Sequence, residues 1–162
     1  MKTKSTTWKE IADLGGMVAI VLSLILVGYE VRQNTLMMRA QTRDSITEKQ
    51  MTLNSWIATN EYTANIAFRG GRGELERGTQ DAIAFDQLVT GVFREWENSF
   101  YQYEQGLFDQ SEFDARKRAW AVFLAVPGVR GFWKNRRNNF SPRFMAVIDE
   151  IVSKTVPIKI LE

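Results

Sequence analysis

The strongest constraint in this chain is an apolar run near its beginning. Residues 14–29 read LGGMVAIVLSLILVGY and contain no charged side chain. A helix needs about 20 predominantly apolar residues to span a bilayer, so the run alone is slightly short. Trp8 and Tyr29 extend it, because they are 21 positions apart, and that spacing in a helix covers about 32 Å, close to the thickness of a hydrocarbon core. We predict a transmembrane helix over residues 14–29, preceded by an N-terminal tail and interfacial segment over residues 1–13.

Trp8 and Tyr29 are predicted to anchor this helix at the two membrane surfaces, because amphipathic rings favour the headgroup region. Two other kinds of segment fit less well. A signal peptide is disfavoured because Glu10 and Asp13 precede the apolar core and no Ala-x-Ala pattern follows it. A buried helix of a globular domain would usually show a polar stripe, and this run has almost none.

Three small residues, Gly15, Ala19 and Ser23, are spaced four positions apart within the run. Such a ladder lies on one helix face and lets two backbones approach closely in lipid. It is either a helix-contact site, for a second copy or for a membrane partner, or a chance pattern, because small residues are common in membrane helices. We take the contact site as a hypothesis.

Residues 30–162 are expected to form a helical soluble domain, because no segment shows sustained alternation of apolar and polar residues. No helix breaker occurs from Glu30 to Trp56, which predicts a long stalk helix. Its thin apolar seam is expected to pack on other helices or on a second copy. The seam consists of Met38, Ile46, Leu53 and Trp56. The predicted fold class is all-α: an N-terminal transmembrane helix continuing into a long stalk helix packed with a small helical bundle.

Shorter helices are predicted in the remainder of the chain. The first follows Asn60, and the second runs from about Asp81 to Tyr103. The third begins at Ser111, the fourth contains Trp133, and the last begins at Pro142. Ser111 with Asp114 three positions later resembles a capping box, and Ser141 before Pro142 is typical of a helix start. The glycine-rich segment RGGRGELERG, residues 69–78, is expected to end the first of these helices and to form a mobile loop.

Aromatic residues concentrate in the second half of the chain. Thirteen of the nineteen aromatic side chains lie between Phe93 and Phe144. Aromatic residues that recur at helical spacing more often build a core than a ligand site. We expect a compact aromatic core there.

Charge is divided along the chain in the same region. Residues 74–114 carry 2 basic and 10 acidic groups, and residues 116–162 carry 10 basic and 3 acidic groups. Either the two segments pack together and neutralise each other, or they present two docking surfaces of opposite sign. We expect internal pairing for about half of these charges.

The residue types present exclude several classes of chemistry. The chain has no Cys and no His, which removes disulfides, thiolate nucleophiles, His-based triads and zinc sites built from His or Cys. Glu97 and Glu104 share one helix face, but no second helix with matching carboxylates accompanies them, as a di-iron bundle would need. No motif for an activated serine occurs. We therefore predict no enzymatic activity, no cofactor and no metal site.

A polar cluster is nevertheless predicted in the helical domain. Its members are Arg94, Glu97, Asn98, Tyr101, Arg136 and Arg137. Glu97 and Arg94 are expected to tie the predicted helix over 81–103 to Arg136 or Arg137. Arg94, Asn98 and Tyr101 are also candidates for the polar lining of a ligand pocket.

Three segments resemble a group of small uncharacterised bacterial proteins that have one N-terminal membrane anchor and a helical domain. They are the apolar helix running into VRQNTLMMRAQT, then WENSFYQYEQGLFD, and then PGVRGFWKNRRNNFSPRF. Together they cover roughly residues 14–45 and 93–145. The resemblance implies a bacterial membrane protein with a helical domain. It implies no activity and no catalytic residues.

The expected location is therefore the bacterial inner membrane, in a single pass. The positive-inside rule is tied, with three basic residues on each side of the apolar run. These are Lys2, Lys4 and Lys9 before it and Arg32, Arg39 and Arg43 after it. We expect the helical domain on the cytoplasmic side, because its basic C-terminal end could rest on an anionic leaflet.

These features favour an accessory or scaffolding protein that acts through helix–helix association. The expected partners are the lipid bilayer and either a second copy or a membrane protein complex. Nucleic acid is not expected, because the overall charge is nearly balanced at 21 basic and 19 acidic residues. The alternative is a membrane-anchored sensor or small-ligand-binding helical module, which would need a pocket in the aromatic-rich bundle.

Overall fold

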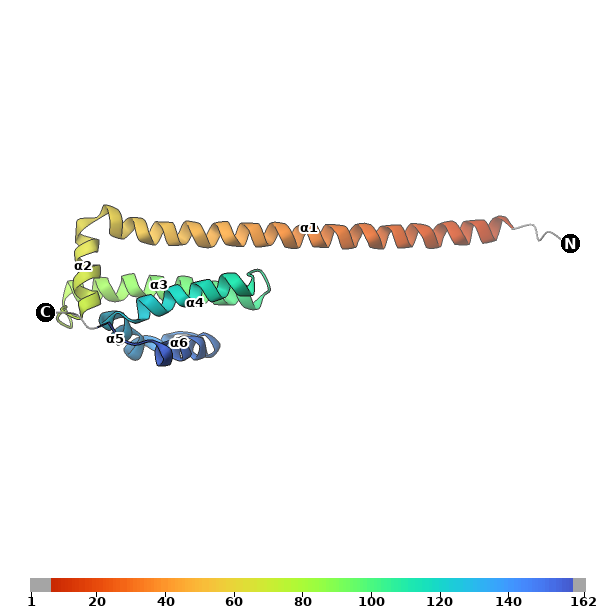
Figure 1. The fold of residues 1–162 in the computed structure, drawn as a ribbon. Coiled ribbons are helices and arrows are strands. Elements are labelled where there is room, and N and C mark those ends of the chain that lie inside the picture. Colours follow the sequence, from red (N-terminus) through yellow and green to blue (C-terminus); the bar gives the residue numbers. More distant parts are fainter. Residues whose placement is uncertain (1–6, 159–162) are drawn as a thin grey trace. The chain divides into compact units, whose positions relative to one another are not determined.

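The computed structural model describes residues 7–158, and the part of the chain that it describes is helical with no strand (Figure 1). The elements are α1 (Trp8–Thr59), α2 (Glu61–Arg72), α3 (Gln80–Glu104), α4 (Gln110–Leu124), α5 (Pro127–Arg136), the short 3-10 helix η1 (Arg137–Asn139) and α6 (Pro142–Lys154). The chain divides into two units, one ending at Ala40 and a compact one that begins at Gln41. The predicted all-α fold class is confirmed.

The first unit is the N-terminal part of α1, which is a single helix of 52 residues. Of the described helices, α1 is the one with a stretch long and apolar enough to cross a membrane, and none of that stretch is buried. The hydroxyl of Ser23 donates a hydrogen bond to the backbone oxygen of Ala19 at 2.8 Å. Ser23 and Tyr29 carry the hydroxyl groups of the apolar run, and the Ser23 hydroxyl thus has its hydrogen-bond partner within the helix itself.

The last part of α1 belongs to the compact unit. Ile46 is the buried residue of α1, and Leu53 and Ile57 are half-buried. Of the expected seam, Ile46 and Leu53 thus pack within the unit, while Met38 and Trp56 are each about half exposed, and packing of the seam on a second copy stays a prediction. A straight helix of 3.6 residues per turn drifts away from a seven-residue spacing, which explains why Ile57 rather than Trp56 turns inward.

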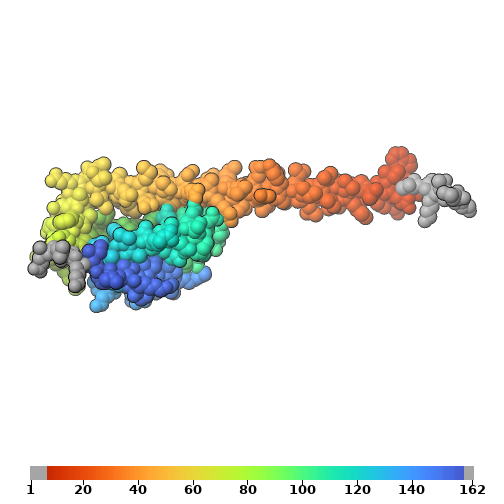
Figure 2. All heavy atoms as spheres, in the orientation of Figure 1, coloured from red at the N-terminus to blue at the C-terminus, as the bar shows by residue number. Residues whose placement is uncertain are grey.

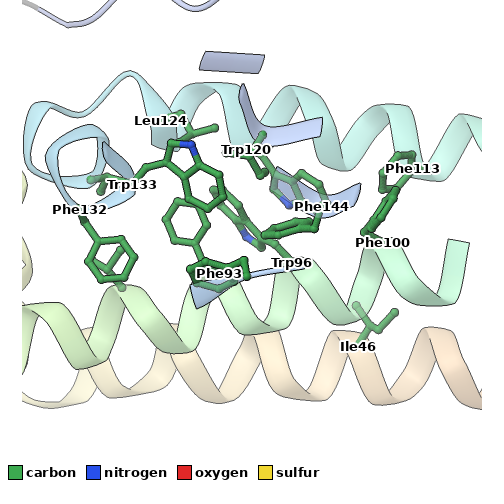
Figure 3. Close-up of a cluster of buried hydrophobic side chains, with 14 of the residues drawn as sticks. Ile46, Phe93, Trp96, Phe100, Phe113, Trp120, Leu124, Phe132, Trp133 and Phe144 are labelled. Atoms are coloured by element: carbon green, nitrogen blue, oxygen red, sulfur yellow. The ribbon is translucent and has the colours of Figure 1, made fainter. Parts of the chain in front are cut away.

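The core of the compact unit is built on the aromatic face of α3, as expected from the sequence. Phe93 is fully buried, and its ring lies 5.1 Å from that of Trp133 and 5.6 Å from that of Phe132, both on α5. Figure 3 shows these rings converging between α3 and α5, with Trp96 beside them. Burying aromatic surface in this way is the main favourable contribution to packing.

The same face of α3 extends the core toward α4 and α6. Trp96 stacks on Trp120 of α4 with ring centroids 5.1 Å apart. Phe144 of α6 is fully buried and meets both Phe100 and Trp120, at 6.1 and 6.2 Å. In Figure 2 the atoms of α4 and α6 lie directly against each other.

Two of the glycines expected to break the chain are instead part of a helix. Gly70 and Gly71 lie in the last turns of α2 and are buried, and α2 ends at Arg72, where Gly73 caps it with φ 77°. A Cβ built on Gly128 of α5 would lie 1.8 Å from the backbone oxygen of Gly70, so α2 and α5 touch backbone to backbone. Tertiary packing here outweighs the poor helix propensity of glycine.

Most predicted helix ends are close to those observed. Gly106 follows the last residues of α3 with φ 71°, and the Leu107 N–H donates to the Gln102 oxygen, as in a Schellman ending. Ser141 precedes α6, with Pro142 in its first turn. The capping box predicted at Ser111 is wrong, because Asp109 precedes α4 and Ser111 lies inside it.

The Gly128 contact gives a direct test of this packing. Gly128→Ala should lower the free energy of unfolding by about 1–3 kcal/mol, because the added methyl group overlaps the backbone of α2. Gly131→Ala is the matched control, since it lies on the same helix and a Cβ there meets nothing within 4 Å. That change should be neutral or stabilise by about 0.5–1 kcal/mol. Urea unfolding of the full chain in detergent measures both, and equal effects would refute the close α2–α5 contact.

Candidate functional site

The most deeply buried charged group of the described residues is Glu95, on α3. Its Oε1 accepts a hydrogen bond from the Ser99 hydroxyl at 2.8 Å and from Arg116 Nη1 of α4 at 2.9 Å. The side chain of Glu95 is 6% exposed and that of Arg116 17%. The Arg116 guanidinium also lies over the Phe108 ring, 5.3 Å from its centroid. A buried carboxylate is thus held by one charge and one hydroxyl.

This ion pair lies beside an apolar cavity of about 350 Å³. The walls come from the end of α1 and from α2, α3 and α4, and from residues just before and in α5. They include Leu53, Ala67, Leu88, Val92, Trp96, Trp120, Phe123 and Val129. The polar residues in its lining are Gln50, Asn54, Glu95 and Arg116. Predominantly apolar walls with a few polar groups are typical of small-molecule sites.

A second pocket, of about 590 Å³, is bounded by glycines of α2, of the loop after it and of α5. These are Gly70, Gly73, Gly78, Gly128 and Gly131. Its charged lining consists of Arg77, Asp86 and Arg136, and Arg136 is paired with Asp86 at 2.8 Å. A shallower groove of about 530 Å³ runs between α1 and α3 beside Trp56, Arg94 and Asn98.

The predicted polar cluster is divided by the structure. Arg94 Nη1 contacts Glu97 Oε2 at 2.6 Å, as its spacing favours. The other oxygen of Glu97 accepts the Ser141 backbone N–H at 2.7 Å, and Arg94 Nη2 donates to the Asn139 oxygen at 3.0 Å. Glu97 therefore supplies the N-terminus of α6 with the acceptor that the Ser141 side chain does not provide.

The expected ties from Glu97 to Arg136 or Arg137 are wrong. Arg136 pairs with Asp86 of α3, and Arg137 pairs with Asp149 of α6. Both arginines lie where α5 passes into η1, which places each beside a different carboxylate. They contribute to packing of α5 against its neighbours and do not join Arg94 and Glu97 in one site.

Of the residues expected to line a pocket, Arg94 and Asn98 line the shallow groove between α1 and α3, and none of the three lines the 350 Å³ cavity. Tyr101 is 55% exposed and the Arg94 side chain 53%, and Asn98 is half-buried in the shallow groove. The polar residues that are buried on α3 are Glu95 and Ser99. Each of them directly follows one of the predicted residues, Arg94 or Asn98, in the sequence. Sequence reasoning missed them, although their four-residue spacing on the aromatic face of α3 is a signal that could have indicated them.

Opposite charges in the two segments of the second half do pair across the bundle. Arg116 contacts Glu95, Arg136 contacts Asp86, and Arg143 contacts Glu104. In each pair the base comes from the basic segment and the acid from the acidic one. These contacts agree with the expectation that the two segments neutralise each other in part.

The residues predicted for membrane contact lie on α1. Trp8 and Tyr29 are 87% and 59% exposed. A Cβ on Gly15 would meet nothing within 4 Å, and Ala19 and Ser23 are exposed as well. Within residues 7–158, no group of three or more acidic side chains gathers in a way that could hold a metal ion.

Comparisons with protein families, with curated proteins and with solved structures gave no match to this chain. The site is therefore interpreted from its own geometry.

The Glu97 contact has a consequence for stability against acid. Partial desolvation raises the pKa of Glu97, but hydrogen bonds from Ser141 and Arg94 outweigh it and leave the pKa below the ordinary 4.5. A carboxyl group whose pKa is lowered by folding stabilises the fold above its unfolded pKa. That contribution is lost as the pH falls through the folded pKa.

Glu97→Gln should therefore be less stable than the unaltered chain by about 1 kcal/mol at pH 7, and the difference should shrink toward zero as the pH falls below 4.5. Urea unfolding at pH 7, 5, 4 and 3 measures it. Glu76→Gln, at an exposed position in the loop before α3, is the control and should change stability little at any pH. A pH-independent difference for Glu97→Gln would contradict the role of its charge.

Proposed function

We propose that this chain is a single-pass, membrane-anchored helical protein that acts as an accessory or scaffolding subunit without catalysis. The observation that supports it best is the charge-free stretch over residues 14–29, which lies in a helix with none of that stretch buried. The N-terminal part of α1 would be the anchor, and the helical domain would lie on one side of the bilayer.

Leaving the apolar surface of this stretch in water would be unfavourable. Soluble proteins rarely expose a contiguous apolar patch of more than a few hundred Å², and the large apolar side chains from Leu14 to Val27 are all more than half exposed. A bilayer would cover them. It would also tolerate the backbone, because a helix satisfies its own hydrogen bonds and the Ser23 hydroxyl is bonded to Ala19.

The proposed partners follow from the same helix. Gly15, Ala19 and Ser23 would form a helix-contact face for a second copy or for a membrane protein complex. The bacterial inner membrane, with the helical domain on its cytoplasmic side, is the proposed location. A scaffolding role needs no reactive group, and the compact unit would supply a stable helical surface on the anchor.

The anchor itself can be tested with two matched double substitutions. Val21→Asp with Leu22→Asp places two charges at the centre of the run and should release most of the chain from the membrane pellet after an alkaline carbonate wash. Each such charge costs about 2.5–3.5 kcal/mol at the centre of a membrane helix. Leu36→Asp with Met37→Asp, at equally exposed positions of α1, should leave the chain in the pellet. Release of both variants or of neither would contradict the proposed span.

The association face has its own test. Gly15→Leu with Ala19→Leu should shift the intact mass of the detergent-extracted complex toward that of the single chain, because bulky side chains keep the two backbones apart. Met17→Leu with Val21→Leu changes other positions of the same stretch and is the control. An unchanged mass in the first variant would remove the contact face from the proposal.

A second candidate function is a membrane-anchored sensor or small-ligand-binding module. It is favoured by the 350 Å³ apolar cavity with the Glu95–Arg116 pair at its edge. An apolar pocket with a few convergent polar groups is typical of a small-molecule binding site.

A further inference from the structure

We propose that the cavity beside Glu95 and Arg116 binds a small, uncharged, ring-containing molecule with one oxygen that accepts a hydrogen bond. This inference rests on the ligand-binding candidate above and is independent of the membrane anchor. It depends on three properties of the cavity: its aromatic wall, the charge balance of its polar end, and its opening.

The aromatic wall favours a flat ring. Trp96 and Trp120 are stacked at 5.1 Å with their planes 15° apart, and Phe123 meets Trp96 edge to face at 5.6 Å. All three residues line the cavity, together with aliphatic groups such as Leu53 and Val92. A volume of about 350 Å³ is near the lower end of the range for small-molecule sites. A fused bicyclic molecule would fill it better than a long flexible chain, which would lose more conformational entropy on binding.

The polar end favours a neutral ligand. Glu95 and Arg116 neutralise each other, and their contact is already shielded from water. A charged ligand would enter an apolar cavity without a counter-charge, at a large desolvation cost. A ketone or hydroxyl oxygen would not carry this cost.

Arg116 also has donors to spare for such an oxygen. A guanidinium carries five N–H groups, and the described contacts of Arg116 with acceptors are to Glu95 Oε1 alone. Glu95 holds the guanidinium from one side, and the N–H groups that do not contact Glu95 are the donors that we propose for the ligand oxygen. Pre-organised donors of this kind fix the orientation of a ligand in an otherwise apolar site.

The opening of the cavity is marked by its exposed lining residues. Gln50 and Asn54 of α1 and Ala119 of α4 are exposed, so a ligand would enter between these two helices. The α1 wall is part of the same continuous helix that carries the apolar run.

The experiment uses the full chain in detergent micelles and two probes of similar size. The neutral ketone 1-tetralone should bind saturably and quench tryptophan fluorescence, because Trp96 and Trp120 line the cavity. The anion 1-naphthoate should bind at least about ten-fold more weakly. Titration of empty micelles corrects for partition of the probes into detergent.

Ala119→Phe should weaken tetralone binding by about ten-fold or more, since it places a ring at the opening. Ala115→Phe is the matched control one turn earlier on α4, exposed and outside the cavity lining, and should bind as the unaltered chain does. Near-ultraviolet circular dichroism checks that both fold. If the Ala119→Phe variant does not fold, Leu53→Trp, which fills the cavity from α1, is tested in its place.

The outcomes separate the two levels of the proposal. Binding of 1-naphthoate as tightly as tetralone, and sensitive to Ala119→Phe, would overturn the uncharged ligand class while supporting a ligand-binding module. No saturable binding of either probe, or equal binding by the Ala119→Phe and Ala115→Phe variants, would overturn both. Neither result bears on the carbonate extraction that tests the membrane anchor.

Discussion

The packing of aromatic rings on one face of α3 is the interaction on which the compact unit depends. The face carries Phe93, Trp96 and Phe100, and each ring meets a partner on a different helix, as Figure 3 shows. The helices α4, α5 and α6 have 15, 10 and 13 residues, and isolated helices of this length are marginal in water. They are held in place by a shared core, and the polar contacts at its margins fix how each helix is seated.

The polar contacts differ in what they can contribute. Exposed pairs such as Lys154 with Glu150 are worth little, because solvent screens them. The Glu95–Arg116 pair is different, since removing either partner would leave the other charge buried. Such a pair is weak evidence for stability, because apolar residues of similar size often serve as well. Its position at the edge of a cavity is what gives it functional interest.

Much of the fold could be predicted from the sequence because the strongest signals are local and periodic. The charge-free run, the aromatic spacing and Gly106 and Pro142 each indicate helices or their ends without reference to any other part of the chain. The predictions that were wrong concern features that depend on contacts between residues far apart in the sequence. Gly70 lies in α2 and is buried, with Gly128 of α5 against its backbone. On α3, Arg94 is exposed and the next residue, Glu95, is buried. Which of the two faces the core depends on how the helix is turned against its neighbours.

The contact between Gly70 and Gly128 also bears on how related chains can be recognised. A Cβ at position 70 would overlap the Phe85 ring, and one at position 128 would overlap the backbone of α2. Most core positions accept a change of apolar residue if the volume is kept, but at these two any side chain would force the neighbouring ring or backbone to shift. A chain that retains the same α2–α5 crossing must keep both glycines even after its aromatic residues have diverged. The spacing between them is therefore a signature of the fold that overall sequence similarity would not reveal.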